Sequence, residues 1–254
     1  MTTAAKLKIA EKTVSFFIDN FPSSGEILIG GPPSLLWAFL CLYFAGHLKR
    51  WKGLRTGYTR KIFHFSIFFT VVMIQWVWGT PAVCLFGGMT TLVIFYALWR
   101  GEGHILYEAM GREKDAPRRT YYIIIPYIAT LLGGLTSNIL FGPVAIVGYL
   151  VTGLGDAVGE PIGTKFGKHT YTVPSLSAVK AVRSLEGSAA VFLMSLIAIV
   201  LSVLLSSQFT FESAYIGWIP LLAFICTLIE AVSPHGWDNA TMQILPTLLA
   251  THML

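Results

Sequence analysis

Charged residues are scarce in this 254-residue chain. Only 12% of its residues are Asp, Glu, Lys or Arg, whereas soluble domains carry roughly 25%. None of the four occurs in six stretches, residues 27–48, 62–99, 120–155, 187–211, 213–229 and 239–254. A membrane-spanning helix needs about 20 largely apolar residues. The uncharged stretches, with a mean hydropathy of +0.66, exclude an ordinary soluble domain and predict a polytopic membrane protein.

Paired cysteines and a secretory leader are missing as well. Cys41, Cys84 and Cys226 each lie singly in an apolar stretch, which argues against a disulfide framework and against a cysteine-based metal site. The N-terminus lacks a signal-peptide pattern. The absence of a transit-type leader favours a bacterial inner membrane over an endoplasmic reticulum or plastid membrane. No basic stripe interleaved with aromatics accompanies the net charge of +5, so no nucleic-acid partner is expected.

The apolar stretches predict about eight spanning helices. They cover roughly 27–48, 62–78, 81–99, 121–137, 142–156, 187–207, 214–231 and 240–254, with turns expected at 79–81 and 136–138. The last is barely long enough to cross, so seven spans stay open. Fifteen of the eighteen Lys and Arg lie in loops 49–61, 100–120 and 157–186, which places those loops in the cytoplasm and both termini outside.

The expected fold is therefore an all-α, polytopic helical bundle of seven or eight transmembrane helices. Residues 27–254 form one membrane-embedded domain. Residues 1–26 precede it, and within them apolar and lysine residues alternate at helical spacing, which predicts an amphipathic helix on the membrane surface. Charges also alternate in sign over residues 102–119, and this pattern predicts a solvated, salt-bridged loop.

Ionisable residues gather at the membrane edge in residues 152–188, and such residues are costly there unless they serve a function. Asp156 and Glu160 are one helical turn apart, so their carboxylates share a face and repel unless a cation lies between them. Mg²⁺ is usually held by one or two carboxylates together with substrate phosphates. The pair predicts a Mg²⁺ site, the alternative being two helix-end charges facing headgroups or a lysine.

Small and basic residues follow this pair. Gly159, Gly163 and Gly167 recur every four residues, with Lys165 and Lys168 among them. Glycine lets backbone N–H groups approach an anion, and lysine adds a positive charge. The glycines are equally typical of a helix-packing face. The pattern is not a P-loop, because neither its residue order nor a preceding strand is present.

A second basic group precedes the sixth span. Lys180, Arg183 and Glu186 lie three residues apart, so a helix brings them near one face. The two cations suit a polyphosphate, and Glu186 suits a metal or a base. The alternative is a basic flank of the kind found on the inner side of membrane helices.

Several short elements together resemble the polyprenol kinase family, which includes dolichol kinase, phytol kinase and the CTP-dependent diacylglycerol kinase of yeast. The family's nucleotide signature is matched by Asp156-Ala157, by Gly163 and Gly167-Lys168-His169, and by residues 184–188 (SLEGS). Arg60-Lys61-Ile62-Phe63-His64 resembles its Arg-Lys-x-x-His element, and Glu230 with residues 233–239 (SPHGWDN) its C-terminal element. Arg183 stands where the family usually has lysine, and this changes the geometry of that charge.

The resemblance implies an enzyme that transfers the γ-phosphate of CTP, with Mg²⁺, to a membrane-embedded alcohol at the cytoplasmic face. We expect a long-chain isoprenoid alcohol such as phytol, farnesol, geranylgeraniol or a polyprenol. Positioning and charge neutralisation dominate such reactions. The residues expected to bind nucleotide or phosphate are Arg60, Lys61, Gly163, Lys165, Gly167, Lys168, Lys180 and Arg183; those for metal are Asp156, Glu160 and Glu186.

The base that accepts the alcohol proton is left open among Asp156, Glu186 and Asp238, and His64 is a further catalytic candidate. Two other functions remain possible. A CTP:phosphatidate cytidylyltransferase would attack the α-phosphate, but its Lys-Arg and Lys-Asp signature is not matched. A small-solute transporter would place its polar residues near the bilayer midplane, whereas here the charges lie at one edge.

Overall fold

A computed structural model describes residues 3–173, 181–206, 208–209, 215–234 and 236–254. Its elements in chain order are α1 (Thr3–Asn20), α2 (Ser24–Lys52), α3 (Thr56–Arg100), α4 (Ile105–Glu108), the 3-10 turn η1 (Glu113–Asp115), α5 (Tyr121–Phe141), the 3-10 turn η2 (Gly142–Val144), α6 (Ala145–Leu150), the π-helical η3 (Val151–Asp156), α7 (Ala157–Phe166), β1 (Thr170–Val173), β2 (Ala181–Ser184), α8 (Leu185–Leu205), α9 (Tyr215–Val232) and α10 (Asp238–Met253). Within the described residues, the strands form one antiparallel pair in which Thr170 faces Ser184.

The helices confirm an all-α membrane protein. Over the described ranges, four helical segments are long and apolar enough to cross a membrane: Ser24–Lys52, Thr56–Arg100, Tyr121–Phe166 and Leu185–Leu205. The second and third have 45 and 46 residues, about twice the length that one crossing needs. Over the described residues, each of the eight expected ranges lies largely in helix, the last three in α8, α9 and α10.

One expected turn is confirmed and another is wrong. Gly79 breaks α3 with φ 75° and ψ −170°, which divides it into the two expected spans. The next hairpin does not turn at 136–138: α5 continues to Phe141, and the chain turns at Gly142, where φ is 57°. The polar residues do not end the helix because Asn138 donates to the carbonyl of Gly134 and to the hydroxyl of Tyr149 inside the bundle.

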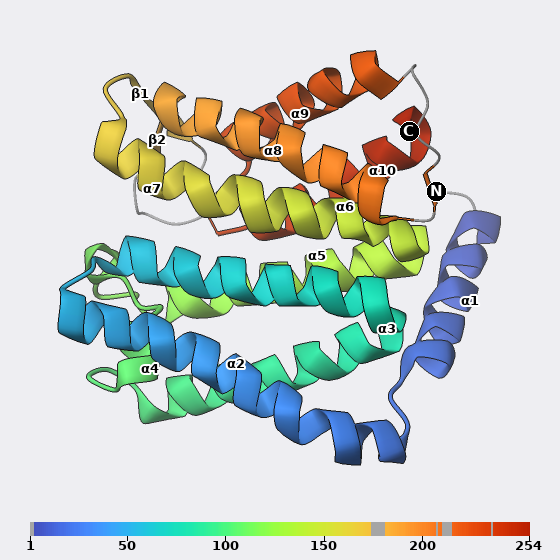
Figure 1. Ribbon diagram of the computed structural model, residues 1–254, viewed down its shortest axis with the longest axis horizontal. Coiled ribbons are helices and arrows are strands. Elements are labelled where there is room, and N and C mark those ends of the chain that lie inside the picture. Colours follow the sequence, from blue (N-terminus) through green and yellow to red (C-terminus); the bar gives the residue numbers. More distant parts are fainter. Residues whose placement is uncertain (1–2, 174–180, 207, 210–214, 235) are drawn as a thin grey trace.

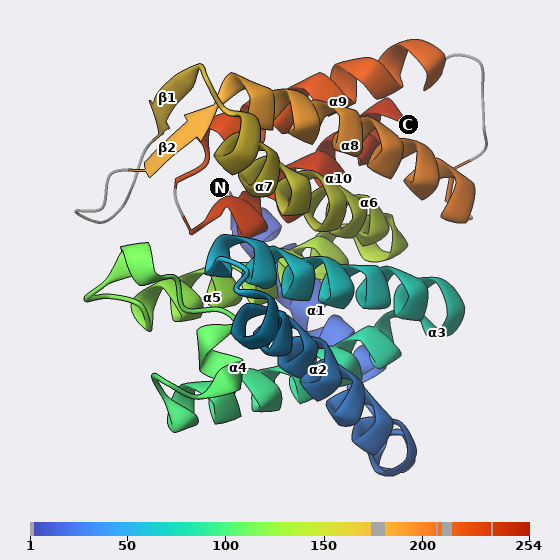
Figure 2. The same ribbon diagram turned by 60° about the vertical axis from the view of Figure 1, so that its left-hand side comes forward.

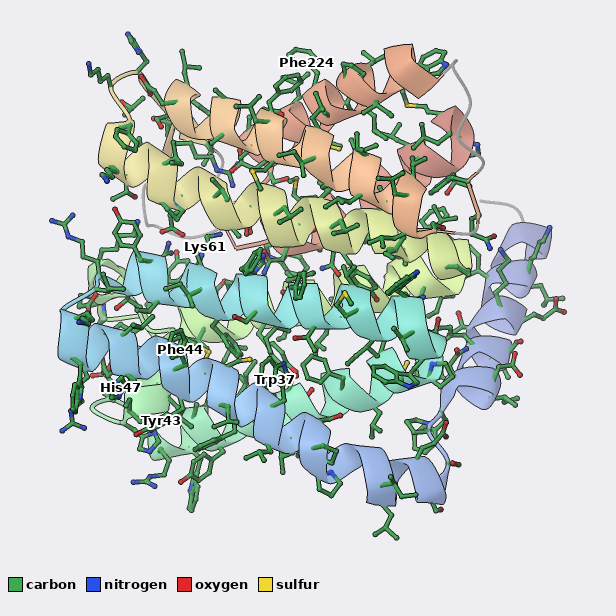
Figure 3. All side chains as sticks on the ribbon, in the orientation of Figure 1. Trp37, Tyr43, Phe44, His47, Lys61 and Phe224 are labelled. Atoms are coloured by element: carbon green, nitrogen blue, oxygen red, sulfur yellow. The ribbon has the colours of Figure 1, made fainter. Side chains whose placement is uncertain are left out.

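The bundle has two halves, α2–α4 and α5–α10 (Figure 1). They meet where α3 packs on α6 and α7. A single core of buried apolar side chains runs through both halves and includes Leu42, Phe86, Val147, Ile199 and Met242. Large apolar side chains also cover the outside: Trp37, Tyr43 and Phe44 on α2 and Phe224 on α9 are exposed (Figure 3), as expected of a lipid-facing surface.

The basic loops gather at one end. The β1–β2 hairpin and α4 lie at the same end of the bundle in two views (Figures 1 and 2), and both termini lie at the opposite end in Figure 1. Helix α1 crosses that opposite end beside α3 and α5, where Lys12 donates to the carbonyl of Leu140. Phe16 of α1 is buried, whereas Phe17 and Ile18 are exposed.

Candidate functional site

Asp156 is the last residue of the π-helical segment η3, a type of segment that often marks functional sites. Two glycines of η3 allow neighbouring helices to approach closely. A Cβ at Gly153 would lie 2.6 Å from Cβ of Phe68 on α3, and one at Gly155 would lie 3.0 Å from Oγ of Ser195 on α8. Asp156 is thereby held between the two halves of the bundle.

The carboxylate of Asp156 forms a buried cluster with two side chains of α3. Nζ of Lys61 lies 2.7 Å from its Oδ2, and Nε2 of His64 lies 3.5 Å from the same atom. His64 Nε2 also contacts the carbonyl of Thr152 at 3.1 Å. Lys61 points from α3 into the space between the halves (Figure 3). The Lys61 and Asp156 side chains are 6% and 7% exposed, so neither charge could be removed alone without a large cost.

Glu160, one turn further on, is surrounded by cations. Arg112 Nη1 lies 2.9 Å from its Oε1, Arg60 Nη2 3.5 Å from its Oε2, Lys114 Nζ 3.8 Å from Oε1 and Lys61 Nζ 3.9 Å from Oε2. A carboxylate whose charge is balanced by four basic groups is poorly suited to bind Mg²⁺ as well. Glu160 therefore holds the basic groups in place, and its expected role as a metal ligand has little support in the geometry.

The loop of residues 102–119 is only partly solvated, which corrects the expectation from its charges. Arg112 and Asp115 are 3% and 2% exposed and are joined at 2.8 Å. Burial by itself lowers the pKa of Arg112, but the carboxylates of Glu160 and Asp115 outweigh it and raise that pKa. Alternating charge could not reveal that this loop folds back onto α7.

The other end of that loop is a separate ion-pair group. Glu108 lies 2.7 Å from Arg119 and 2.9 Å from Lys49. Burial raises the pKa of Glu108, but hydrogen bonds from Arg119, the Gly103 amide and Lys49 outweigh it and lower the pKa to about 2. This group ties the loop to the end of α2.

Arg183 of β2 binds two carboxylates from the C-terminal part of the chain. Its Nε lies 2.9 Å from Glu230 Oε1 and its Nη2 lies 3.1 Å from Asp238 Oδ2. The strand pairing places Arg183 opposite Tyr171 and so aims the guanidinium at the first turn of α10.

These groups line a polar cavity of about 420 Å³ between the two halves, which we call the polar cavity. Its basic lining residues are Arg60, Lys61, Arg112, Lys114 and Arg183, and its acidic ones are Asp115, Asp156, Glu160, Glu230 and Asp238. Nη1 of Arg60 and Nη1 of Arg183 are both buried without a hydrogen-bond partner. Buried donors are rarely left unpaired, so both are available to bind a ligand in this cavity.

A second cavity, of about 400 Å³ and here called the apolar cavity, runs beside α3 into the bundle. Aromatic and aliphatic side chains such as Phe63, Phe68, Ile94 and Tyr149 line it, and Phe16 of α1 lines it too. Arg60, Lys61 and Asp156 line both cavities. His64 lines the apolar cavity beside them. The two spaces therefore meet at the basic and acidic groups of α3 and η3.

Other residues that the sequence predicts for the site are not at the junction of the two cavities. Lys165 and Lys168 are exposed and line neither cavity; Lys165 lies over the ring of Phe166. The carboxylate of Glu186 binds Nδ1 of His169 at 2.8 Å. Gly187 and Ser188 of α8 line the polar cavity, whereas Glu186 does not. Lys180 lies outside the described residues.

The glycines of α7, and Gly167 directly after it, mainly serve packing. A Cβ at Gly159 would lie 2.7 Å from Val191, and one at Gly167 would lie 2.3 Å from the carbonyl of Gly163 and 2.8 Å from Ser184. This favours the helix-packing interpretation, since such residues let α7 and α8 approach closely. Gly163 also lines the polar cavity, so it combines packing with access to a ligand.

The acidic residues of the polar cavity differ in how well they could hold Mg²⁺. Over the part of the chain that the structure describes, no three acidic, histidine or cysteine side chains are grouped so that they could hold a metal ion by themselves. Glu230 and Asp238 both bind Arg183, and both line the polar cavity. Two such carboxylates suit Mg²⁺ when phosphate oxygens complete its coordination.

The chain is similar to a kinase of a polyprenol-type lipid. Dolichol kinase sec59 of Schizosaccharomyces pombe is 32% identical to it over 151 residues, which are 56% of this chain and 28% of that relative. The chain thus matches well under half the length of this relative. No family model matches the chain, and no solved structure matches it. The similarity supports a relationship to polyprenol kinases, in agreement with the resemblance of the short elements.

Proposed function

We propose that this protein is a membrane lipid kinase that transfers the γ-phosphate of CTP to a long-chain isoprenoid alcohol at the cytoplasmic face. The observation that carries the proposal is the meeting of a polar and an apolar cavity at Arg60, Lys61 and Asp156. A water-soluble nucleotide and a hydrocarbon chain need chemically opposite sites that open onto one another. The similarity to a dolichol kinase adds independent support for the same class of reaction.

The polar cavity is suited to the nucleotide phosphates. Arg60 and Arg183 each present a buried, unpaired Nη1, and arginine binds phosphate oxygens through such N–H groups. Lys61 stands at the junction, where charge on the transferred group would be greatest. Mg²⁺ would be held by Glu230 and Asp238 together with the phosphates, and it would neutralise phosphate charge.

The base is best assigned to Asp156. Of its rivals, Glu186 faces away toward His169, and Asp238 lines the polar cavity but not the apolar one. The alcohol oxygen would form a bond to the γ-phosphorus as the bond to the β–γ bridging oxygen breaks and CDP leaves. The hydroxyl proton would pass to the carboxylate of Asp156. Lys61 and His64 hold that carboxylate in position.

The choice of CTP and of isoprenoid alcohols follows from the family resemblance, and the side of the membrane follows from the basic loops. Fifteen of the eighteen Lys and Arg lie in residues 49–61, 100–120 and 157–186, which the charge bias assigns to the cytoplasm. The β1–β2 hairpin, which carries Arg183, lies at the same end of the bundle as α4 (Figure 2). A bacterial inner membrane suits this topology.

The test uses purified protein with Mg²⁺ and CTP labelled at either the γ- or the α-phosphate. Phytol, farnesol, a polyprenol, diacylglycerol and phosphatidate are offered in mixed micelles, with ATP and GTP as competing donors. We expect γ-label in an isoprenoid alcohol and no α-label in any lipid. Transfer of α-label to phosphatidate with release of pyrophosphate would instead establish a cytidylyltransferase, and absence of transfer from either label would refute both.

A further inference from the structure

The apolar cavity reaches the outer surface of the bundle between the second half of α3 and α5. Gly87, Gly88 and Thr91 line it from α3, and Tyr127 and Leu131 line it from α5. Gly88 and Leu131 are also exposed. Residues that line a cavity and are exposed at the same time mark its opening. We call the gap bordered by these five residues the lateral opening.

Few helix contacts and two glycines leave the lateral opening unfilled. Helix α5 packs on α10, α6 and α1 and scarcely touches α3. A Cβ at Gly87 or Gly88 would meet no atom within 4 Å. Gly148, by contrast, could not carry a Cβ, because it would lie 2.2 Å from the carbonyl of Gln243. Gly87 and Gly88 are therefore not needed for close helix packing. Because they have no side chain, they leave the gap between α3 and α5 unfilled.

A polar contact crosses the opening. The hydroxyl of Tyr127 donates to Oγ1 of Thr91, and Oγ1 of Thr91 donates to the carbonyl of Gly87 at 2.7 Å. These groups join α3 to α5 by side chains where their backbones stay apart. A contact of this kind holds the width of the gap without filling it.

The two ends of the cavity set the direction of an occupant. Lys61 and Asp156 lie at the end near the basic loops, and Phe16 of α1, the helix that crosses the opposite end, also lines the cavity. The walls between them are largely apolar. A molecule with one polar end and a long hydrocarbon tail matches this arrangement, with its polar end at Asp156.

We propose that the hydrocarbon chain of the alcohol enters sideways from the bilayer through the lateral opening and lies in the apolar cavity. This inference rests on the proposed function for the identity of the alcohol. Entry through the polar cavity would move the chain through water, and each CH₂ exposed to water is unfavourable. Sideways entry avoids that cost, since the chain passes from one apolar environment to another.

The opening can be closed from the α3 side with a matched control elsewhere. Gly88→Phe places a ring in the gap, because the space around its Cβ is empty. Gly217→Phe makes the same change at an exposed glycine of α9 that also has no atom within 4 Å of a Cβ. Leu131→Trp narrows the opening from α5. Thermal unfolding of each variant shows whether it folds like the wild type.

Two readouts separate entry of the chain from transfer of phosphate. We expect Gly88→Phe and Leu131→Trp to raise KM for phytol about tenfold or more, while KM for CTP and turnover of a short, water-soluble prenyl alcohol stay unchanged. A diazirine-bearing isoprenoid alcohol should cross-link to peptides of α3 and α5 in the wild type and in Gly217→Phe, and much less in Gly88→Phe.

Each outcome decides one of the two proposals. Unchanged phytol KM and unchanged cross-linking in both blocked variants would overturn sideways entry. Equal loss of activity on the short and the long alcohol would overturn it too, since the defect would then lie at the reacting groups. A third outcome is that the alcohol cross-links in the wild type and not in Gly88→Phe, while the protein phosphorylates no alcohol. That result would support sideways entry through the lateral opening and would refute the proposed kinase activity.

Discussion

Replacing Asp156 by asparagine keeps the size of the side chain and removes the carboxylate that borders both cavities. If Asp156 accepts the alcohol proton, turnover should fall by about 10²–10⁴-fold, the usual contribution of a positioned base, which is ~3–5 kcal/mol in the barrier. CTP binding should change little, because Arg60 and Arg183 remain. The assay is the initial rate of γ-label transfer to phytol, with binding of CTP measured separately.

The stability cost must be separated from the loss of chemistry. Asp156→Asn leaves the ammonium of Lys61 with Glu160 at 3.9 Å as its remaining acidic partner, and breaking a buried ion pair costs about 3–5 kcal/mol. Glu108→Gln is the control, because it removes a carboxylate held at 2.7 Å by Arg119 and lies outside both cavities. Turnover of Asp156→Asn within about threefold of wild type, under 1 kcal/mol, would refute the assignment.

Three further predictions concern charge. Arg183→Met should raise KM for CTP about 10–100-fold, since a hydrogen bond to a charged group contributes ~1.5–3 kcal/mol, and titration with CTP checks this. Lys165→Gln with Lys168→Gln should leave KM for CTP unchanged because both side chains are exposed; a large increase would restore the phosphate role expected from their spacing. The pKa of Glu108 is about 2, below its ordinary 4.5, because hydrogen bonds, Arg119 first, outweigh its burial. Its contribution to stability should be complete above pH 4.5 and fade as the pH falls toward 2, so the unfolding temperatures of wild type and Glu108→Gln should converge on acidification.

The spans could be predicted from sequence because an uncharged stretch of sufficient length has few alternatives to crossing a bilayer. The turn at Gly79 could be predicted because Thr80 and Pro81 follow it. The turn at Gly142 was missed because Ser137 and Asn138 look like loop residues, whereas both are buried within α5. Polar residues that bond within a helix cannot be told from turn residues by composition alone.

The candidate site was only partly visible in the sequence. Asp156, Arg183 and Asp238 were singled out, and the structure brings all three to one cavity. Arg112 was missed, because alternating charges do not say whether a loop is solvated or folds onto the bundle. Glu160 is expected to bind a metal because its spacing from Asp156 can be read from the sequence. The four cations that surround it come largely from distant elements, so the sequence does not reveal them.

The central claim is that nucleotide and alcohol meet at Arg60, Lys61 and Asp156, and a bisubstrate analogue tests it most directly. Cytidine is joined through a polyphosphate to a phytyl chain, and its affinity is compared with those of CTP and phytol. A compound that occupies both cavities at once should bind far more tightly than either part, and Gly88→Phe should remove the gain. Binding no tighter than the better of the two parts would contradict the account.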